Sequence, residues 1–337
     1  MHFGIWLPVY GGWLGAWGFD TEPSASESLK LAILAERSGF DYVYASEKFL
    51  NCIHGPTHDV DDASTILAAI AGQTKALQLV DALKPGFRPP LVAAQMTATV
   101  DRLSSGRVGV NIACGWWEEE FRQAGVPWRG HDEKYGFASR YLNELESLWA
   151  GNINGGVTTR RRLANATRPP IWVSGHSNAA LAFASQHADV LFLNGMPPDE
   201  IRVLIERYRK AHPARSVPTI AINAFIILGS TETEAHRRRA ELLSRARTEL
   251  IAQYRRETAR AGAEAWNNLS DEALIDANGG FATALVGSDE YVRERVGQYE
   301  ATGVDLMLCQ FPAMVEDIIR FSNCTLSSEP TLNNCTR

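Results

Sequence analysis

Short apolar segments alternate along the chain with longer segments in which apolar residues recur every three or four positions. Eight of the short segments have the length and composition of strands, and they begin at Phe3, Tyr42, Leu77, Val108, Pro170, Val190, Thr219 and Asp305. Between them, stretches such as Glu27–Gly39, Leu91–Gly106 and Tyr291–Gly303 place their apolar residues on one face of a helix. Strands and helices are therefore predicted to alternate along almost the whole chain.

Eight strands alternating with helices in about 310 residues predict an α/β fold, a (β/α)8 TIM barrel with insertions. A doubly wound parallel sheet is the rival architecture, but no G-x-G-x-x-G follows a predicted strand, so a Rossmann dinucleotide site is unsupported. Residues 1–321 are expected to form a single barrel domain with insertions near 46–62, 114–134 and 249–285. The last insertion is charged and then glycine-rich, and residues 322–337 form a polar tail without periodicity.

The composition excludes several classes of function. Hydrophobic residues make up 45 % of the chain and charged residues 21 %, as in ordinary globular proteins. The net charge of −6 argues against nucleic acid as a partner. No apolar run is long enough to span a membrane. The first residues lack the basic segment of a secretion signal, and five scattered cysteines without C-x-x-C fit a reducing cytoplasm.

The barrel prediction indicates where functional residues should lie, because in such barrels they follow the C-terminal ends of the strands. These segments are residues 9–23, 46–62, 82–89, 114–134, 174–178 and 194–198. Five tryptophans fall within them: Trp13, Trp17, Trp116, Trp117 and Trp128. They predict an aromatic-walled pocket for a flat or small organic ligand, or else packing of the loops on the barrel.

Two segments offer polar groups for a ligand. Gly175, His176 and Ser177 end a strand and open a helix, whose free N–H groups suit a phosphate; the alternative is simple capping of that helix by Ser177. Alternation along the fourth strand points Asn111 into the barrel mouth together with Ala113. A buried amide there must find its partners in the protein or in a ligand.

Histidines and acidic residues in the loops have several interpretations. Gly55-Pro56 prevents a helix between His54 and His58, so no metal site is expected and a role in a substrate loop is favoured. His131 and Tyr135 offer hydrogen-bond donors to a site, or they cap and pack their helix. The run Glu118–Glu120 is a solvated face in which one residue can turn inward.

Several segments, taken together, resemble the luciferase-like flavin monooxygenases, and most closely the branch of alkanesulfonate, dimethylsulfone and pyrimidine-ring-opening monooxygenases. The most specific is ATVDRLSSGRVGVNIACGW, which runs from Ala98 to Trp116; others are GIWLPV, GHDEKY, PPIWVSGHSNAA and LVGSDEYVRERV. The matching segments follow the order of the family up to about Phe321.

The resemblance implies a (β/α)8 barrel that binds reduced FMN and uses O2 to oxygenate a small organic substrate, with cleavage of a C–S or C–N bond as one outcome. Because no nicotinamide motif is present, NAD(P)H is expected to act only through a separate flavin reductase. A homodimer or homotetramer is expected. The same fold also serves deazaflavin-dependent hydride transfer, and biosynthetic oxygenation of a heterocycle or amide and a flavin-binding barrel without turnover are further alternatives.

The resemblance also implies functional positions. The flavin contacts that it implies are Glu47, Lys48, Asn111, Glu120, Lys134, Tyr135 and Ser177, beside Gly175 and His176. Lys134 stands where relatives have arginine, and Cys114 where they often have serine or threonine, so a bidentate fork and a hydroxyl donor are both lost. The candidate catalytic residues are Asn111, His131, Tyr135 and His54. By side-chain chemistry and loop position alone, His54, His58, His131 and Tyr135 are the candidates to steer protons. The substrate pocket is expected to contain Trp13, Trp17, Trp116, Trp117 and His58.

The charge of these loops favours one class of substrate. Arg88, Arg122 and Arg129 are the nearby arginines, and no cluster of Arg or Lys is evident in the sequence. A sulfonate would require a bidentate arginine clamp, whereas a sulfone, amide or heterocycle would require aromatic walls and a few placed donors. We therefore expect a small neutral substrate.

Overall fold

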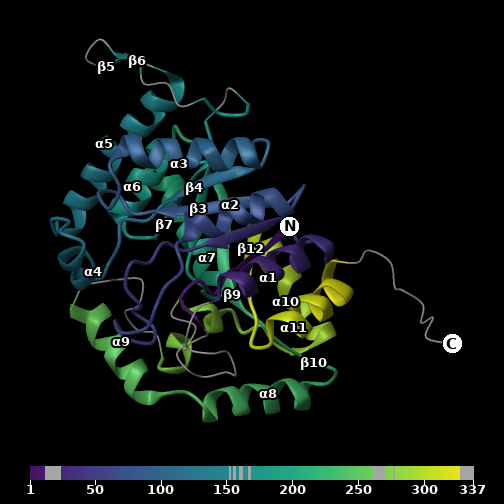
Figure 1. The fold of residues 1–337 in the computed structure, drawn as a ribbon. Helices are drawn as coiled ribbons and strands as arrows, with labels where there is room; N and C mark the ends of the chain where they lie inside the picture. Colours follow the sequence, from purple (N-terminus) through teal and green to yellow (C-terminus); the bar gives the residue numbers. More distant parts are fainter. Residues whose placement is uncertain are drawn as a thin grey trace.

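Eight parallel strands close into a barrel in the computed structural model, which describes residues 1–11, 24–151, 153–154, 157–158, 162–165, 168–260, 270–275 and 278–326 (Figure 1). The barrel strands are β1 (His2–Trp6), β2 (Tyr42–Ala45), β3 (Gln78–Leu83), β4 (Val108–Ile112), β7 (Ile171–Ser174), β8 (Val190–Leu193), β9 (Thr219–Phe225) and β12 (Leu306–Gln310). Their closed order is β1-β12-β9-β8-β7-β4-β3-β2. The predicted (β/α)8 barrel is confirmed, and an open doubly wound sheet is excluded.

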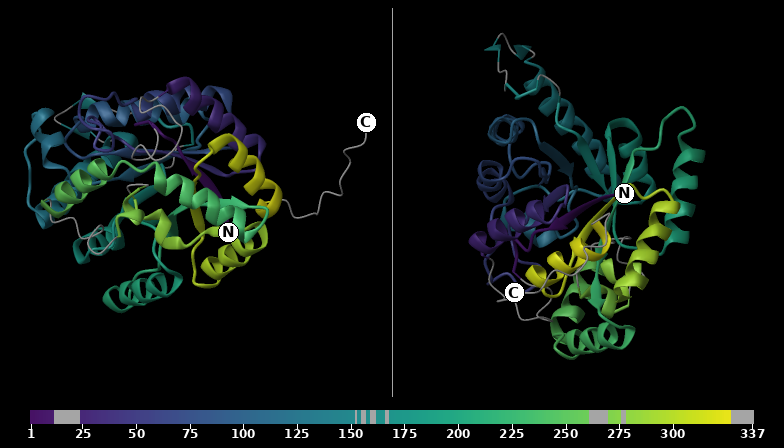
Figure 2. Two further views of the ribbon diagram at one scale, coloured as in Figure 1. Left: turned by 90° about the horizontal axis from the view of Figure 1, so that it is seen from below. Right: turned by 90° about the vertical axis from the view of Figure 1, so that its right-hand side faces the viewer.

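Helices surround the barrel, as the two further views show (Figure 2). They are α1 (Ala25–Arg37), α2 (Ala63–Gln73), α3 (Pro90–Leu103), α4 (Glu118–Gln123), α5 (His131–Ala150), α6 (Asn178–His187), α7 (Pro198–Ala211), α8 (Glu232–Ser244), α9 (Thr248–Arg260), α10 (Asp289–Ala301) and α11 (Met314–Phe321). Side chains at their N-termini fix several starts: Ser24 caps α1, Asp62 caps α2 and Ser288 caps α10. No described helix is both long and apolar enough to cross a membrane.

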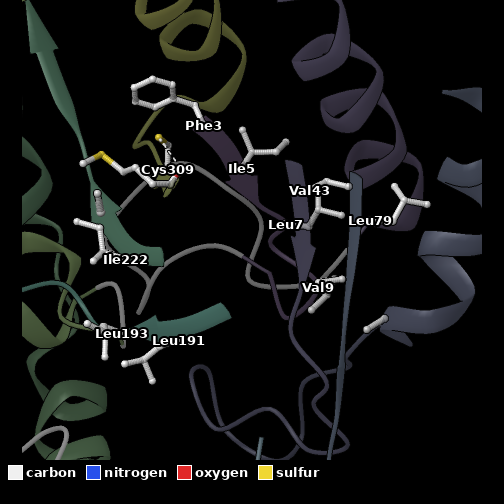
Figure 3. Packing of buried hydrophobic residues seen from close by; sticks show 14 of the residues in the cluster. Phe3, Ile5, Leu7, Val9, Val43, Leu79, Leu191, Leu193, Ile222 and Cys309 are labelled. Atoms are coloured by element: carbon white, nitrogen blue, oxygen red, sulfur yellow. Dashed lines mark hydrogen bonds between the residues drawn. The ribbon is translucent and has the colours of Figure 1, made fainter. Parts of the chain in front are cut away.

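Both faces of the barrel strands are buried, which explains why their sequences are continuous apolar runs. Outward residues such as Ile5, Val43 and Leu79 belong to the large cluster between strands and helices (Figure 3). Inward residues such as Trp172 and Leu308 form a second, smaller cluster inside the barrel. The strand alternation therefore decides which side chains can reach the barrel mouth.

The apolar run Thr219–Leu228, predicted as one strand, is divided between two. β9 stays in the barrel, whereas β10 (Ile227–Gly229) leaves it and pairs with β11 (Val286–Ser288). Between them lie α8, α9 and the 3-10 turns Glu272–Leu274 and Gly280–Thr283. The chain thus leaves the barrel before residue 249. The sequence does not reveal this boundary, because both strands are buried and the apolar pattern shows no break between them.

Two smaller segments complete the description. β5 (Ile153–Asn154) and β6 (Val157–Thr158) form a hairpin beyond the end of α5 (Figure 1). The start of the predicted tail, Ser322–Leu326, is a π-helical turn that continues α11. The remainder of that tail, and also Trp13 and Trp17, lie outside the described residues.

Candidate active site

A cleft that is partly open to solvent lies at the C-terminal ends of β1, β2, β3, β4, β7 and β8. This is the end of the barrel at which the sequence predicted functional residues. The last inward-pointing residues of the strands form its floor, among them Trp6, Tyr44, Ala82 and Phe192. The rings of Trp6 and Tyr44 lie 4.6 Å apart, so much of this floor is aromatic.

Asn111 is fully buried beneath the floor, and both its amide nitrogen and its amide oxygen form hydrogen bonds within the protein. Its Nδ2 donates to the Tyr44 hydroxyl at 2.9 Å, and its Oδ1 accepts from the Ser174 hydroxyl at 2.9 Å. Tyr44 and Ser174 line the cleft, whereas Asn111 does not. Asn111 therefore positions two hydroxyl groups at the surface of the cleft.

Neutral amides occupy the β8, β9 and β12 part of the barrel mouth. Gln310 Nε2 donates to Asn223 Oδ1, and Asn223 Nδ2 donates to the Asn278 carbonyl at 3.3 Å. Asn194 and Asn278 line the cleft, and Asn223 and Gln310 are fully buried behind them. We call Phe192, Asn194, Asn223, Asn278 and Gln310 the neutral side of the site.

The opposite part of the mouth, formed by the loops after β2 and β3 and by α4, is charged. Glu47 is 4 % exposed, forms an ion pair with Arg88 and accepts the backbone N–H of Lys84. Arg88 also contacts Asp62, the cap of α2, at 2.5 Å. We call Glu47, Lys48, Lys84, Arg88 and Glu120 the charged wall.

Glu120 and Lys84 form a second ion pair of the charged wall, at 3 % and 7 % side-chain exposure. The backbone N–H of Phe49 also donates to Glu120 at 2.7 Å. Burial acts to raise the pKa of Glu120, but the ammonium groups of Lys84 and Lys48 hold it below its ordinary value. Burial lowers the pKa of Lys84, and Glu120 opposes that shift. The structure thus turns Glu120 inward, while Glu119 pairs with Arg122 outside.

The start of α6 forms a third part of the cleft. Ser177 Oγ accepts the N–H of Ala180 at 3.2 Å, so the capping interaction exists, and Ser177 also lines the cleft with Gly175 and His176. Gly175 has a φ of +116°, and a Cβ there would lie 3.3 Å from that of Ala180. A glycine is therefore favoured where the backbone turns beside the helix start.

The first turn of α5 faces this segment. His131, Lys134 and Tyr135 all line the cleft. Lys134 Nζ lies 3.4 Å from the centroid of the Trp128 ring and donates to the Gly115 carbonyl at 3.3 Å. Burial lowers the pKa of Lys134 to about 8. Trp128 itself lies beneath Lys134 and is not part of the cleft lining.

Trp116 and Trp117 line the outer part of the cleft and contact α9. The Trp116 ring packs edge-on against Tyr254 with centroids 5.2 Å apart, and Trp117 Nε1 donates to Glu257 at 3.2 Å. The segment that the chain adds after β9 therefore supports the aromatic rim of the cleft.

Other predicted residues lie elsewhere. His54 is buried, its ring lies 5.9 Å from that of His58, and neither residue lines the cleft. Arg88, Arg122 and Arg129 do not line it either. Within the described ranges, no group of three His, Cys, Asp or Glu side chains is placed to hold a metal ion.

The structure brings three lysines to the cleft that the sequence does not present as a group. Lys48, Lys84 and Lys134 all line the cleft. Lys48 and Lys84 come from the loops after β2 and β3, and Lys134 comes from the first turn of α5, so the sequence does not show them as a cluster. Lys84 was not among the predicted site residues, although it lies in the loop segment 82–89; its position directly after β3 was the available signal.

The closed barrel and the cleft at the carboxyl ends of its strands place the protein among TIM-barrel proteins with the active-site architecture of enzymes. Residues 1–306 match the luciferase-like monooxygenase family, and the chain belongs to that family.

Individual relatives agree with this assignment. The chain is 31 % identical over 344 residues to an FMNH2-dependent dimethylsulfone monooxygenase of Pseudomonas putida, covering 97 % of this chain and 94 % of the relative. It is 30 % identical to the enzyme of the same name from Pseudomonas fluorescens (strain Pf0-1), covering 97 % and 93 %. A riboflavin lyase crystal structure superposes with a TM-score of 0.80 at 18 % identity, covering 97 % of this chain and 90 % of that one, and supports the fold.

Proposed function

We propose that this protein is an FMNH2-dependent monooxygenase that oxygenates a small neutral sulfone. The observation that carries the proposal is the division of one cleft into a charged wall and a neutral side, with no arginine among the described residues that line it. The similarity to two dimethylsulfone monooxygenases along nearly the whole chain supports the substrate class.

The residues present fit FMN. Ala113, Cys114 and Gly115 are small and follow β4 at the cleft, which leaves room for a flat ring system. Gly115 has a φ of +73°, and a Cβ there would lie 2.6 Å from the Phe121 ring, so a larger residue would not fit. When bound in its reduced form, FMN supplies the electrons that activate O2.

The start of α6 is the part of the cleft that suits the phosphate. Its free N–H groups, with Ser177, Gly175 and the facing Tyr135, form an anion site of the kind found at helix N-termini. Lys134 adds a cation at the first turn of α5. With the phosphate placed there, the ring of FMN would lie beside the charged wall, near the Glu47, Lys48 and Glu120 side chains.

The neutral side suits a sulfone, which has two strong acceptor oxygens and no charge. Asn194 and Asn278 are neutral polar residues that line the cleft together with Phe192. The three arginines of the nearby loops are engaged elsewhere: Arg88 with Glu47, Arg122 with Glu119, and Arg129 over the Phe137 ring at 3.8 Å. A sulfonate would therefore lack its bidentate partner.

In the proposed reaction, the sulfone, O2 and reduced FMN give an aldehyde, a sulfinate, water and oxidised FMN, and the C–S bond is broken. One oxygen atom of O2 is inserted at the carbon next to the sulfonyl group, and the other leaves as water with two electrons and two protons from reduced FMN. The oxygenated carbon departs as an aldehyde, and the electron pair of the broken C–S bond stays with sulfur, which leaves as a sulfinate. His131 and Tyr135 line the cleft and are the candidates to give and take protons.

The protein side of this chemistry is positioning and exclusion of water. Asn111 fixes the Tyr44 and Ser174 hydroxyls in the floor, and Trp116 and Trp117 close the outer part of the cleft. His54 and His58 can act only through neighbouring groups, because they lie outside the lining. A separate flavin reductase supplies the reduced cofactor, and the protein acts as a homo-oligomer.

A reconstituted assay tests the proposal. The protein is supplied with FMN, a flavin reductase and NADH, and dimethyl sulfone and methanesulfonate are offered in parallel. We expect methanesulfinate and formaldehyde in equal amounts from the sulfone and no product from the sulfonate. Sulfonate turnover that is lost in Arg129→Ala but retained in Arg122→Ala would replace the neutral substrate by an anionic one. Lack of product from both would redirect the search to heterocycles and amides.

A further inference from the structure

A buried carboxylate flanked by two lysines faces the cleft. Glu120 forms its ion pair with Lys84, and Lys48 is close enough for its charge to act on both groups. Lys48 Nζ also lies 3.5 Å from Cys52 Sγ. All three charged residues line the cleft. Over the whole charged wall, the three cations Lys48, Lys84 and Arg88 face the two carboxylates of Glu47 and Glu120, which leaves one positive charge in excess.

The position of Lys84 is fixed from several sides. Its backbone N–H donates to Glu47, and its ammonium group binds Glu120. Its Nζ lies 5.9 Å and 5.5 Å from the ring centroids of Phe49 and Phe87, which stack on each other at 4.8 Å. The ammonium group therefore stays at the cleft and does not turn toward bulk solvent. A charge fixed in this way, away from water, acts strongly on a ligand charge beside it.

Oxidised and reduced FMN differ only at the ring, in its charge, its N–H groups and its shape. Both carry the same phosphate, and the reduced ring is anionic near neutral pH whereas the oxidised ring is neutral. Groups at the phosphate, such as Ser177 and Lys134, therefore meet the same charge in both forms. A cation at the ring favours the reduced form, whereas contacts that are equal for both forms give no discrimination.

We propose that Lys84, held in place by Glu120, makes the cleft prefer reduced FMN over oxidised FMN. The inference rests on the proposed function, because it assumes that FMN is the cofactor. It adds a role that neither FMN binding nor the choice of substrate requires: the charged wall selects the oxidation state that a reductase delivers and releases the spent form. Lys84 is thus a specificity residue for the oxidation state of the cofactor.

Two binding titrations for each variant test this role. Reduced FMN is titrated under anaerobic conditions and oxidised FMN in air, and the ratio of the two dissociation constants is the readout. In Lys84→Met we expect the preference for the reduced form to fall at least tenfold, mostly through weaker binding of the reduced form. Lys134→Met is the matched control: it should weaken both forms alike and leave the ratio unchanged.

The fold of Lys84→Met is checked by its melting temperature, because this variant leaves Glu120 buried without its partner. If it does not fold, Lys84→Met/Glu120→Gln removes both charges and is held to the same tenfold criterion. An unchanged ratio in a folded variant, or a wild-type protein that binds both forms equally, overturns the inference and leaves FMN binding intact. A wild-type protein that binds neither form would instead contradict the proposed function.

Discussion

The charged wall and the neutral side lie at the same barrel mouth but are stabilised in different ways. On the charged wall, Glu47 and Glu120 are buried with cationic partners from neighbouring loops. On the neutral side, Gln310 and Asn223 are also buried, but Gln310 donates an amide hydrogen bond to Asn223 and no charge is involved. The first arrangement depends on keeping every partner, since an unpaired buried charge is costly, whereas the second loses less when one group is removed.

The difference also suggests a division of labour. Charge is useful where a ligand carries charge, and the proposed cofactor does. Amides and aromatic rings are useful where a ligand is polar but neutral, as a sulfone is. We therefore interpret the charged wall as the cofactor side of the cleft and the neutral side as the substrate side.

The largest effect on stability is expected at Arg88. Arg88→Met removes the partner of Glu47, whose side chain is 3 % exposed, and leaves that carboxylate buried alone. The free energy of unfolding should fall by about 3 to 5 kcal/mol, measured by urea denaturation. Arg122→Met, which breaks an exposed pair with Glu119, is the control and should unfold like the wild type. Equal effects of the two changes would contradict the account of the charged wall.

The second prediction concerns Asp81, on the outward face of β3 behind the charged wall. Burial raises its pKa from 3.8 to about 7, although Ser64 donates to it at 2.7 Å. The folded protein therefore holds this proton more tightly than the unfolded chain, and the contribution of Asp81 to stability decreases as the pH rises from about 4 to 7.

Asp81→Asn should remove that decrease, which is on the order of a few kcal/mol because one pKa unit corresponds to about 1.4 kcal/mol. Urea denaturation at several pH values between 4.5 and 7.5 measures it. Ser64→Ala removes a group that lowers the pKa of Asp81, so it should make the pH dependence steeper or extend it to higher pH. A variant Asp81→Asn with the wild-type pH profile would show that Asp81 does not titrate in this range.

On the neutral side we expect a smaller loss. Asn223→Leu removes the acceptor of Gln310 without leaving a charge behind, so stability should fall by about 1 to 3 kcal/mol. If this side binds the substrate, the KM for dimethyl sulfone should rise while the affinity for reduced FMN stays at the wild-type value. A change confined to FMN affinity would reverse the division of labour between the two sides.

The smallest effect is expected at the rim. Trp117→Phe keeps an aromatic ring but removes the N–H donor to Glu257, so the free energy of unfolding should fall by about 0.5 to 1.5 kcal/mol. Trp116→Phe is the matched control, because the contact of Trp116 with Tyr254 is between rings and survives the change. Identical melting temperatures for the two variants would show that the hydrogen bond from Trp117 to Glu257 does not stabilise the protein.

Local patterns were sufficient to predict the barrel. The strands are short apolar runs, and in the helices apolar residues recur every three or four positions. Both patterns can be recognised from neighbouring residues alone. The boundary between β9 and β10 could not be predicted in this way, because β10 is separated from β9 only by its pairing with β11, 59 residues further along. The position of the cleft could also be predicted, because functional residues of such barrels follow the C-terminal ends of the strands.

The partners of the charged residues could not be predicted from local patterns. Lys84 and Glu120 are separated by 36 residues, and only the fold brings them together. The sequence shows Arg88 only as one of three arginines near the predicted site, and its partner Glu47 is evident only from the structure. His54 and His58 were chosen by residue type and loop, but neither is part of the cleft lining. Residue type and loop position therefore identify candidates, and burial with its partners decides among them.

A crystal structure of the protein with reduced FMN and dimethyl sulfone, prepared without O2, tests the central claim most directly. The account predicts the phosphate at Ser177 and the start of α6, the ring beside Ala113–Gly115 with one edge toward Lys84 and Glu120, and the sulfone against Phe192, Asn194 and Asn278. A ring that lies against the neutral side, with the sulfone at Lys84, would contradict the division between cofactor and substrate sides.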